Sequence, residues 1–165
     1  MRYICAIDPG NKESAYVLAD NNLRPVSFVK IENELMWDHM IEALCQLEAD
    51  AEVLFAIEMI ASYGMAVGAE VFDTCRWIGR MEERLKKQDV LMVYRIEEKM
   101  QICHSPKAND ANIRQALIDR FAPNTPNKGK GTKRAPGWFY GFHADIWQAY
   151  AIAVTAYEID LEERG

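Results

Sequence analysis

Short apolar runs separated by turn residues fill the first part of the chain. The runs cover residues 2–8, 14–19 and 26–31, with Pro9-Gly10 and the polar stretch 20–25 between them. Three β-type runs joined by turn residues predict three strands. The short connections between them favour an antiparallel meander.

Two longer apolar runs and four helical patterns complete the chain. The runs, residues 52–58 and 90–96, are almost continuous, which is typical of strands buried on both faces of a parallel sheet. Asn33 and Asn109 are suited to cap the first and third helices. Apolar residues at helical spacing predict helices over about residues 33–47, 65–87, 109–121 and 144–161. The order of elements predicts an α/β fold with a central mixed five-stranded sheet flanked by helices.

The composition indicates one globular domain. The chain has 165 residues, of which 50% are hydrophobic and 27% charged, and this balance fits a single domain over residues 1–165. Residues 122–141 are rich in Pro, Gly and Lys, which predicts a basic, mobile loop. No apolar run approaches the about 20 residues of a membrane-spanning helix, and the N-terminus lacks a secretory signal pattern. We therefore expect a cytoplasmic protein with no membrane partner.

Positive charge is concentrated in one segment of an acidic chain. The net charge is −6 at pH 7. Residues 107–134 contain seven Lys or Arg and two Asp, a net charge of +5, so the remainder carries −11. A basic segment on an acidic body can bind a polyanion locally. The charge distribution therefore favours a nucleic-acid partner, although the net charge argues against one.

Three carboxylates stand where predicted strands end or a helix begins. Asp8 ends the first apolar run, Glu58 ends the fourth, and Asp145 lies in the first turn of the last helix beside His143. Carboxyl ends of strands form the crevice where α/β sheets bind ligands. Converging carboxylates repel one another unless a cation lies between them, and oxygen ligands suit Mg²⁺ or Mn²⁺, which activate water for phosphodiester hydrolysis. Each residue alone also has a structural interpretation, Asp8 as a turn former and Asp145 as a helix cap or dipole partner.

Four segments match one known family, in order and over nearly the whole chain. They read AIDPGNKESAYVL, FAIEMIASYGMAVGAEVFDTCRWIGR, KANDANIRQALIDRF and HADIWQAYAIAVTAYE. They resemble the RuvC-like Holliday junction resolvases, especially the phage-type branch. The resemblance implies an RNase H-like fold, a homodimer and Mg²⁺-dependent nicking of branched DNA such as four-way junctions, forks and flaps. Mn²⁺ is expected to substitute for Mg²⁺.

The resemblance also assigns roles to individual residues. Asp8 matches the family's first-strand aspartate, Glu58 its fourth-strand glutamate, and Asp145 an acidic residue of the last helix. Lys107 resembles a basic residue that the family directs at the scissile phosphate. A solvated lysine before a helix is an equal alternative for Lys107. The implied catalytic residues are therefore Asp8, Glu58, Asp145 and Lys107.

The last helix departs from the family pattern. RuvC proteins usually have two acidic or His/Asp positions three residues apart there, and this chain has Asp145 at the first position and Gln148 at the second. The fourth ligand is thus missing or replaced, with His143 as the candidate. A structural role for His143 at the start of the helix is equally consistent with the sequence. The candidate metal ligands are Asp8, Glu58, Asp145 and His143.

The candidate DNA contacts are one aromatic residue and a set of cations. Tyr63 follows Glu58 in a Gly-containing turn, where it could stack on an unpaired base; core packing is the alternative. The aromatic cluster at 138–142 favours a loop attached to the core. The cations expected to contact phosphates are Lys12, Lys107, Arg114, Lys128, Lys130, Lys133 and Arg134.

These observations favour a structure-selective endonuclease that resolves branched DNA, a Mg²⁺-dependent crossover junction endodeoxyribonuclease using a metal-activated water. One alternative is an RNase H-like nuclease acting on RNA or hybrid duplexes. Another is a branched-DNA-binding protein without catalysis, which the glutamine at position 148 keeps open. The site of action would be the cytoplasm, that of a bacterial host if the gene is carried by a phage.

Overall fold

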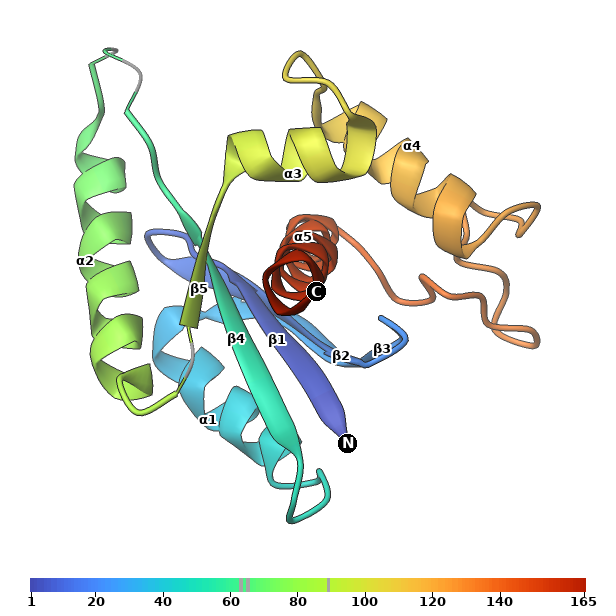
Figure 1. Cartoon of the computed structure of the whole chain (residues 1–165), viewed down its shortest axis with the longest axis horizontal. Helices are drawn as coiled ribbons and strands as arrows, with labels where there is room; N and C mark the ends of the chain where they lie inside the picture. Colours follow the sequence, from blue (N-terminus) through green and yellow to red (C-terminus); the bar gives the residue numbers. More distant parts are fainter. Residues whose placement is uncertain (63, 65, 89) are drawn as a thin grey trace.

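A five-stranded mixed sheet forms the centre of the molecule (Figure 1). The computed structural model describes residues 1–62, 64, 66–88 and 90–165. The strands are β1 (Arg2–Asp8), β2 (Glu13–Asp20), β3 (Pro25–Glu32), β4 (Glu52–Met59) and β5 (Val90–Tyr94), in the spatial order β3-β2-β1-β4-β5. β1, β2 and β3 pair antiparallel, whereas β4 pairs parallel with both β1 and β5. The predicted mixed sheet and its antiparallel meander are confirmed.

β1 is buried on both faces because its side chains alternate between two apolar cores. Ile4 and Ala6 belong to the core on one face of the sheet, and Cys5 and Ile7 belong to the core on the other. Successive side chains of a strand point to opposite faces. Asp8, two residues beyond Ala6, is therefore directed to the same face as Ile4 and Ala6.

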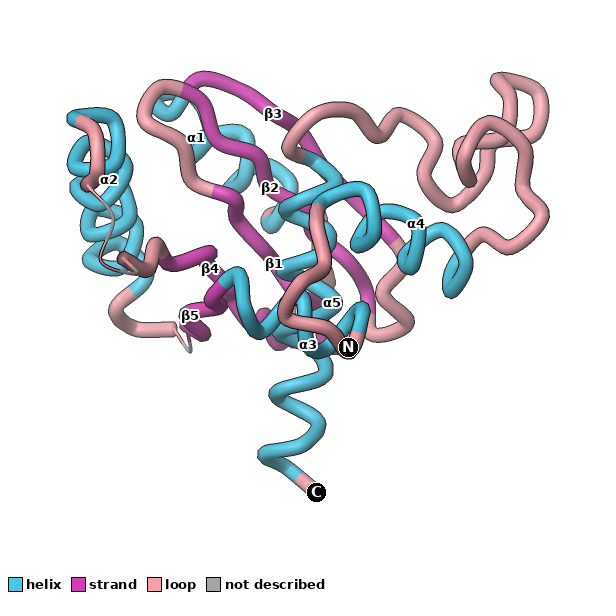
Figure 2. The backbone as a smooth tube through the Cα atoms, turned by 90° about the horizontal axis from the view of Figure 1, so that it is seen from above, coloured by secondary structure: helices cyan, strands magenta, loops and turns pink. Residues whose placement is uncertain are grey.

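Helices cover both faces of the sheet (Figures 1 and 2). α5 (Ile146–Arg164) packs on the face of Ile4 and Ala6, with α3 (Arg95–Cys103) and α4 (Asp110–Phe121) beside it. α1 (Asn33–Leu44) and α2 (Ala69–Leu85) contribute to the core on the opposite face. The first three turns of α5 are almost wholly buried, as expected for a helix that is apolar on every side. In the described part of the chain, no helix is long and apolar enough to cross a membrane.

The four predicted helices are all present, but a fifth helix, α3, was not predicted. The fifth strand was expected to run to residue 96, but it ends at Tyr94, and the unpredicted α3 follows at once. The reason is a local capping interaction, in which the Tyr94 backbone N–H donates to Glu97 Oε2 at 2.7 Å. The last helix begins at Ile146 rather than 144, and α2 begins at Ala69 rather than 65.

The two predicted asparagine caps differ in outcome. Asn109 caps α4 as predicted, because its side chain accepts a hydrogen bond from the Asn112 backbone N–H at 3.0 Å. Asn33 is instead the first residue inside α1, and the N-cap position is Glu32. The Asn33 side chain is used elsewhere, because its amide donates to the Gly10 carbonyl oxygen at 2.9 Å. The prediction of an Asn33 cap is therefore wrong.

The segment 122–141 lies between α4 and α5 and contains no helix, as predicted. Phe139 is fully buried, and Trp138 stacks on Phe121 of α4, so aromatic side chains do attach this loop to the core. Gly131 has φ +68°, and a Cβ there would lie 2.4 Å from a backbone carbonyl oxygen; this turn therefore requires glycine. The loop projects from the body at the end opposite α2 (Figures 1 and 2).

Candidate active site

Two carboxylates meet at the ends of neighbouring parallel strands. β1 and β4 pair in register with Ile7 opposite Ile57, so Asp8 and Glu58, one residue further along each strand, lie level at the same edge. Both side chains point to the face of the sheet that α5 covers, by the alternation described above. The two carboxyl groups share a hydrogen bond. The structure thus brings together the two strand-end carboxylates that the sequence singled out.

Burial raises the pKa of both carboxyl groups, and the negative charge of Glu58 raises that of Asp8 further. Burial is the largest cause for Asp8, followed by the negative charge of Glu58 and then by that of Asp145. Burial is also the largest cause for Glu58, whose pKa is lowered in part by its hydrogen bond with Asp8 and by the Arg95 guanidinium. Two carboxylates held this close favour sharing a proton or binding a cation.

The turn after β1 is held in place by buried polar groups, which fixes the position of Asp8. Ser14 Oγ donates to Asn33 Oδ1 at 2.6 Å and accepts from the Trp77 indole N–H of α2 at 3.0 Å. Gly10 permits this close packing, since a Cβ there would lie 2.2 Å from the Glu13 carbonyl oxygen. The chain therefore leaves the sheet sharply at Pro9-Gly10, immediately after Asp8.

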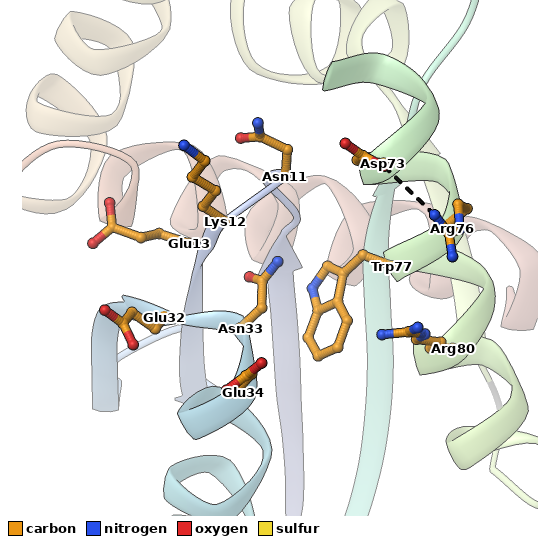
Figure 3. A pocket seen from close by; sticks show the side chains of 10 residues that line it. All are labelled: Asn11, Lys12, Glu13, Glu32, Asn33, Glu34, Asp73, Arg76, Trp77 and Arg80. Atoms are coloured by element: carbon orange, nitrogen blue, oxygen red, sulfur yellow. Dashed lines mark ion pairs between the residues drawn. The ribbon is translucent and has the colours of Figure 1, made fainter. Parts of the chain in front are cut away.

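The same turn borders an open pocket of about 650 Å³ between β2, α1 and α2 (Figure 3). Trp77 points from α2 toward Asn33 across this pocket. The predicted phosphate contact Lys12 is exposed at its rim and shares it with Arg76 and Arg80. Four carboxylates also line it, on Glu13, Glu32, Glu34 and Asp73. Because the carboxylates repel phosphate, this pocket is less suited to bind DNA than the presence of Lys12 alone would indicate.

A polar cluster from α3 and α5 adjoins the Glu58 side of the carboxylate pair. Gln148 Nε2 donates to Glu58 Oε1 at 3.4 Å and to Glu98 Oε2 at 2.6 Å. Arg95 donates to Glu98 Oε2 at 2.5 Å, and also to Gln148 Oε1 and to the Asp110 carboxylate. Gln148, which the sequence marked as a departure, is thus a hydrogen-bond donor that contacts Glu58 directly.

Glu98 is the residue of this site that the sequence analysis missed. Its side chain is 0% exposed, and its Oε1 atom has no hydrogen-bond partner among the described residues. Burial is the largest cause of its raised pKa, the charge of Glu58 adds to it, and the Arg95 guanidinium opposes it. The available signal was the charged sequence at Arg95, Glu97 and Glu98, which does not fit a buried strand and would have indicated a helix start.

Asp145 flanks the pair on the other side, at the start of α5. Its side chain is 51% exposed and forms an ion pair with Lys30 Nζ of β3 at 2.8 Å. It occupies the N-cap position of α5, as its structural interpretation has it, but makes no side-chain capping hydrogen bond. Its charge nevertheless contributes to the raised pKa of Asp8. Asp145 therefore lies close enough to act with Asp8 electrostatically.

Arg114, one of the predicted DNA contacts, lines a small pocket beside Asp145. The pocket has a volume of about 170 Å³ and is bordered by Asp145, Gln148, Asp110 and Arg114. The Arg114 guanidinium lies over the Trp147 ring, 5.3 Å from its centroid. Stacking of this kind holds a cation in place without neutralising it. Arg114 is thus a predicted DNA contact that shares a pocket with Asp145 and Gln148.

The other predicted site residues lie further out. His143 and Lys107 are exposed, and neither makes an ion pair or side-chain hydrogen bond with any part of the chain that the structure describes. Tyr63 lies outside the described residues. The loop cations Lys128, Lys133 and Arg134 are exposed, and Lys130 is half-buried.

The donor chemistry of the site suits a hard divalent cation. Over residues 1–62, 64, 66–88 and 90–165, no three His, Cys, Asp or Glu side chains are arranged closely enough to count as a ready metal cluster. Asp8 and Glu58 nevertheless offer only oxygen atoms, and a cation beside them would relieve the repulsion that raises the pKa of Asp8. Oxygen-only donor sets are the ones that Mg²⁺ and Mn²⁺ prefer.

Known proteins match this chain in fold but not in sequence. No family model matches the sequence, and no curated protein sequence matches it. Among solved structures, Thermus thermophilus RuvC in complex with Holliday junction substrate is similar over 98% of this chain and 96% of its own, with a TM-score of 0.66 and 13% identity. This chain has a RuvC-like fold.

Two further structures support the same fold. Another Thermus thermophilus RuvC structure covers 97% of this chain and 96% of its own, with a TM-score of 0.61 and 15% identity. The Fowlpox virus resolvase, in complex with substrate Holliday junction DNA, covers 96% and 99% with a TM-score of 0.53 and 13% identity. The RuvC-like fold confirms the predicted α/β class and agrees with the family resemblance at the level of the fold. The phage-type branch stays a prediction.

Proposed function

We propose that this protein is a structure-selective endonuclease that hydrolyses phosphodiester bonds in branched DNA. The observation that carries the proposal is the pair Asp8 and Glu58, half-buried at the ends of adjacent parallel strands and sharing a hydrogen bond. The structural neighbours support the choice of substrate, because a RuvC and a poxvirus resolvase were each solved with Holliday junction DNA. Both align over nearly the full length of this chain.

The proposed cofactor is Mg²⁺, with Mn²⁺ as a substitute, held by Asp8, Glu58 and Asp145. When bound, the ion supplies positive charge to the reacting phosphate and lowers the pKa of the attacking water. Asp8 and Glu58 provide ligand oxygens from a rigid sheet edge. Gln148 orients Glu58 through its amide N–H. Lys30 holds the Asp145 carboxylate at the mouth of the site.

The proposed DNA contacts lie around this mouth. Arg114 borders the pocket shared by Asp145 and Gln148. Lys107, on the exposed connection between α3 and α4, is proposed to hold the scissile phosphate or its neighbour. His143 stays a second candidate for a ligand near Asp145. The remaining phosphate contacts are proposed to be Lys12, Lys128, Lys130, Lys133 and Arg134, and Tyr63 is proposed to stack on a base.

A homodimer is the proposed working unit, because paired nicks across a junction require two sites related by two-fold symmetry. The outer face of α2 offers the contact. Phe72 is 61% exposed and Val67, just before α2, is 41% exposed, whereas Ile78 and Met81 of the same helix are buried against the sheet. An exposed apolar group on an amphipathic helix commonly marks an interface. We place the activity in the cytoplasm, that of the bacterial host if the protein is phage-encoded.

Cleavage of matched substrates tests the proposal. Purified protein with Mg²⁺ is incubated with four-way, forked and linear DNA and with an RNA–DNA hybrid of the same sequence. We expect cleavage of the branched DNA, loss of cleavage in Asp8→Asn and Glu58→Gln, and retention of junction binding in both variants. Glu42→Gln, an exposed residue of α1, is the matched control and should cleave as the parent does.

Two results would contradict the proposal in different ways. Cleavage of the hybrid but not of branched DNA would favour the RNase H-like alternative. Junction binding with no cleavage under Mg²⁺ or Mn²⁺ would favour the binding protein without catalysis. Ca²⁺ in place of Mg²⁺ should support binding without efficient cleavage, which separates the role of the cation in binding from its role in chemistry.

A further inference from the structure

The buried carboxylate of Glu98 has no explanation in the packing of α3. Its neighbour Glu97 caps the helix, and a core position at residue 98 would ordinarily be apolar. The Glu98 side chain is instead fully buried. A buried charge is costly unless it is paired and hydrogen-bonded on both oxygens, so its retention here calls for a partner.

The partners that Glu98 has satisfy only one of its two oxygens. Arg95 and Gln148 both donate to Oε2, at 2.5 and 2.6 Å. Oε1 is buried and has no hydrogen-bond partner among the described residues. Glu98 and Glu58 lie close together, because the same Gln148 amide nitrogen donates to both, and the charge of Glu58 raises the pKa of Glu98. The free oxygen therefore belongs to a carboxyl group that lies against Glu58.

Two further acidic groups act on the pair Asp8 and Glu58. The charge of Asp145 raises the pKa of Asp8, and the charge of Glu58 raises that of Glu98. Arg95 forms an ion pair with Glu98, and Lys30 forms one with Asp145. Among the described residues, no cationic side chain forms an ion pair with Asp8 or Glu58. This is where a divalent cation would be most strongly attracted.

We propose that Glu98 is a metal ligand of this site, supplying the carboxylate oxygen Oε1 to a divalent cation held beside Glu58. The Gln148 side-chain amide nitrogen, which donates to both Glu58 and Glu98, would then hold the two carboxylates in position relative to each other. The inference rests on the proposed nuclease function for the identity of the cation. It goes beyond that function by assigning a ligand on α3, an element that the sequence analysis did not predict.

Direct Mn²⁺ titration of the full chain, without DNA, tests this assignment. Free Mn²⁺ is followed by electron paramagnetic resonance in the parent and in Glu98→Gln. We expect Glu98→Gln to weaken Mn²⁺ binding by about tenfold or more, the scale seen when a group that supports a metal site is removed. Glu97→Gln on the same helix is the matched control, because glutamine retains the oxygen that caps α3; it should bind Mn²⁺ as the parent does.

Circular dichroism and thermal melting separate a ligand from a structural residue. A folded Glu98→Gln protein with parental Mn²⁺ affinity overturns the proposal, whatever its melting temperature. If Glu98→Gln does not fold, Glu98→Asp decides, because it keeps the buried charge but withdraws the carboxylate from Glu58 by one methylene group. A folded Glu98→Asp protein with weakened Mn²⁺ binding supports the proposal, and one with parental affinity contradicts it.

Junction cleavage by the same preparations distinguishes this inference from the proposed function. If the parent cleaves junctions and Glu98→Gln binds Mn²⁺ normally, the ligand assignment fails and the nuclease proposal stands. If the parent binds Mn²⁺ but cleaves no branched DNA, the nuclease proposal fails, and the titration still decides whether Glu98 is a ligand.

Discussion

At the scale of single residues, the site holds two carboxylates close together on adjacent strands. Asp8 and Glu58 are fixed by strand register, so they cannot separate to reduce their repulsion. Both have raised pKa values, with burial as the leading cause. Arrangements of this kind favour function at the expense of stability. Removing one of the charges should therefore stabilise the metal-free protein.

The Asp8→Asn variant tests this trade-off. Because the pKa of Asp8 is higher in the folded protein than in the unfolded chain, its stabilising effect is present at low pH and is lost as pH rises toward that raised value. In metal-free buffer at pH 8, Asp8→Asn should therefore unfold at a higher temperature than the parent, each unit of pKa shift corresponding to about 1.4 kcal/mol. The difference should shrink toward pH 5.

Calorimetry with and without Mg²⁺ completes the comparison. A ligand that binds only the folded state raises the melting temperature, so Mg²⁺ should stabilise the parent more than Asp8→Asn. Equal melting temperatures for the two proteins at pH 8 without metal would show that the carboxylate pair carries no strain. Asp38→Asn, at an exposed position of α1, controls for the general effect of removing one charge.

At the scale of elements, α5 connects the two ends of the fold. Its first turn reaches the carboxylates through Gln148, and its last turns contact the start of β1. There Arg2 donates to both oxygens of Asp160, with the second guanidinium nitrogen 2.8 Å from Oδ1, and Arg164 adds a contact at 3.1 Å. The Asp160 side chain is 13% exposed, so this ion pair is shielded from water and should contribute to stability.

The Asp160→Asn variant gives a pH-dependent test of that contact. The Arg2 guanidinium is the main cause of the lowered pKa of Asp160, so the stabilisation is present at neutral pH and is lost as pH falls through the folded-state pKa. At pH 7, Asp160→Asn should lower the free energy of unfolding by about 1–2 kcal/mol, as for other hydrogen bonds to charged groups. Urea denaturation should show this decrease at pH 7 and a smaller one below about pH 4. A decrease that is independent of pH would assign the effect to packing instead.

The same scale shows why the sequence predicted most of the fold but only part of the site. The five strands were predictable because each is a compact apolar run, and Asp8 and Glu58 were predictable because they end two of these runs. α3 was not predictable in the same way, since residues 90–96 read as one apolar run and the helix starts within it at Arg95. Arg95 and Glu98 were therefore missed, because their role depends on a helix that brings them back over the strand ends.

At the scale of the whole molecule, charge is divided between an acidic body and a basic loop. The loop that carries these cations, residues 128–134, projects away from α2 and the sheet (Figures 1 and 2). If the proposed DNA substrate extends from the carboxylates to this loop, each phosphate contact there would release counterions. The loop therefore offers a way for an acidic protein to hold a polyanion without changing its net charge.

Salt dependence measures this contribution. Replacing Lys128, Lys130, Lys133 and Arg134 together with Gln should flatten the plot of log K against log salt, by about 0.9 for each duplex phosphate that the loop no longer neutralises. Folding should change little, because the loop is attached by Phe139 and Trp138 rather than by these side chains. Lys86→Gln with Lys87→Gln, at exposed positions beyond α2, is the control. An unchanged slope in the fourfold variant would mean that these cations only keep the loop soluble.

Oligomeric state is the second property of the whole molecule that can be tested. Light scattering at micromolar concentration should give about twice the 18.9 kDa of one chain. Phe72→Glu should produce a folded monomer, because it places a charge on the exposed face of α2. Leu35→Glu, at an exposed apolar position of α1, should remain dimeric. A parent protein that stays monomeric and still makes paired nicks would contradict the proposed two-fold arrangement.

The carboxylate site is drawn from four places far apart in the chain, at residues 8, 58, 98 and 148. Pairings between such distant segments form late in folding, because closing each long loop costs entropy before the segments can stabilise one another. The last contribution comes from the first turn of the C-terminal helix. A chain still being synthesised thus lacks Gln148 and the cover that α5 gives to the sheet. In the proposed nuclease, the site would therefore be assembled only after α5 has folded onto the sheet, and a chain that stops before residue 146 would lack activity toward the DNA around it.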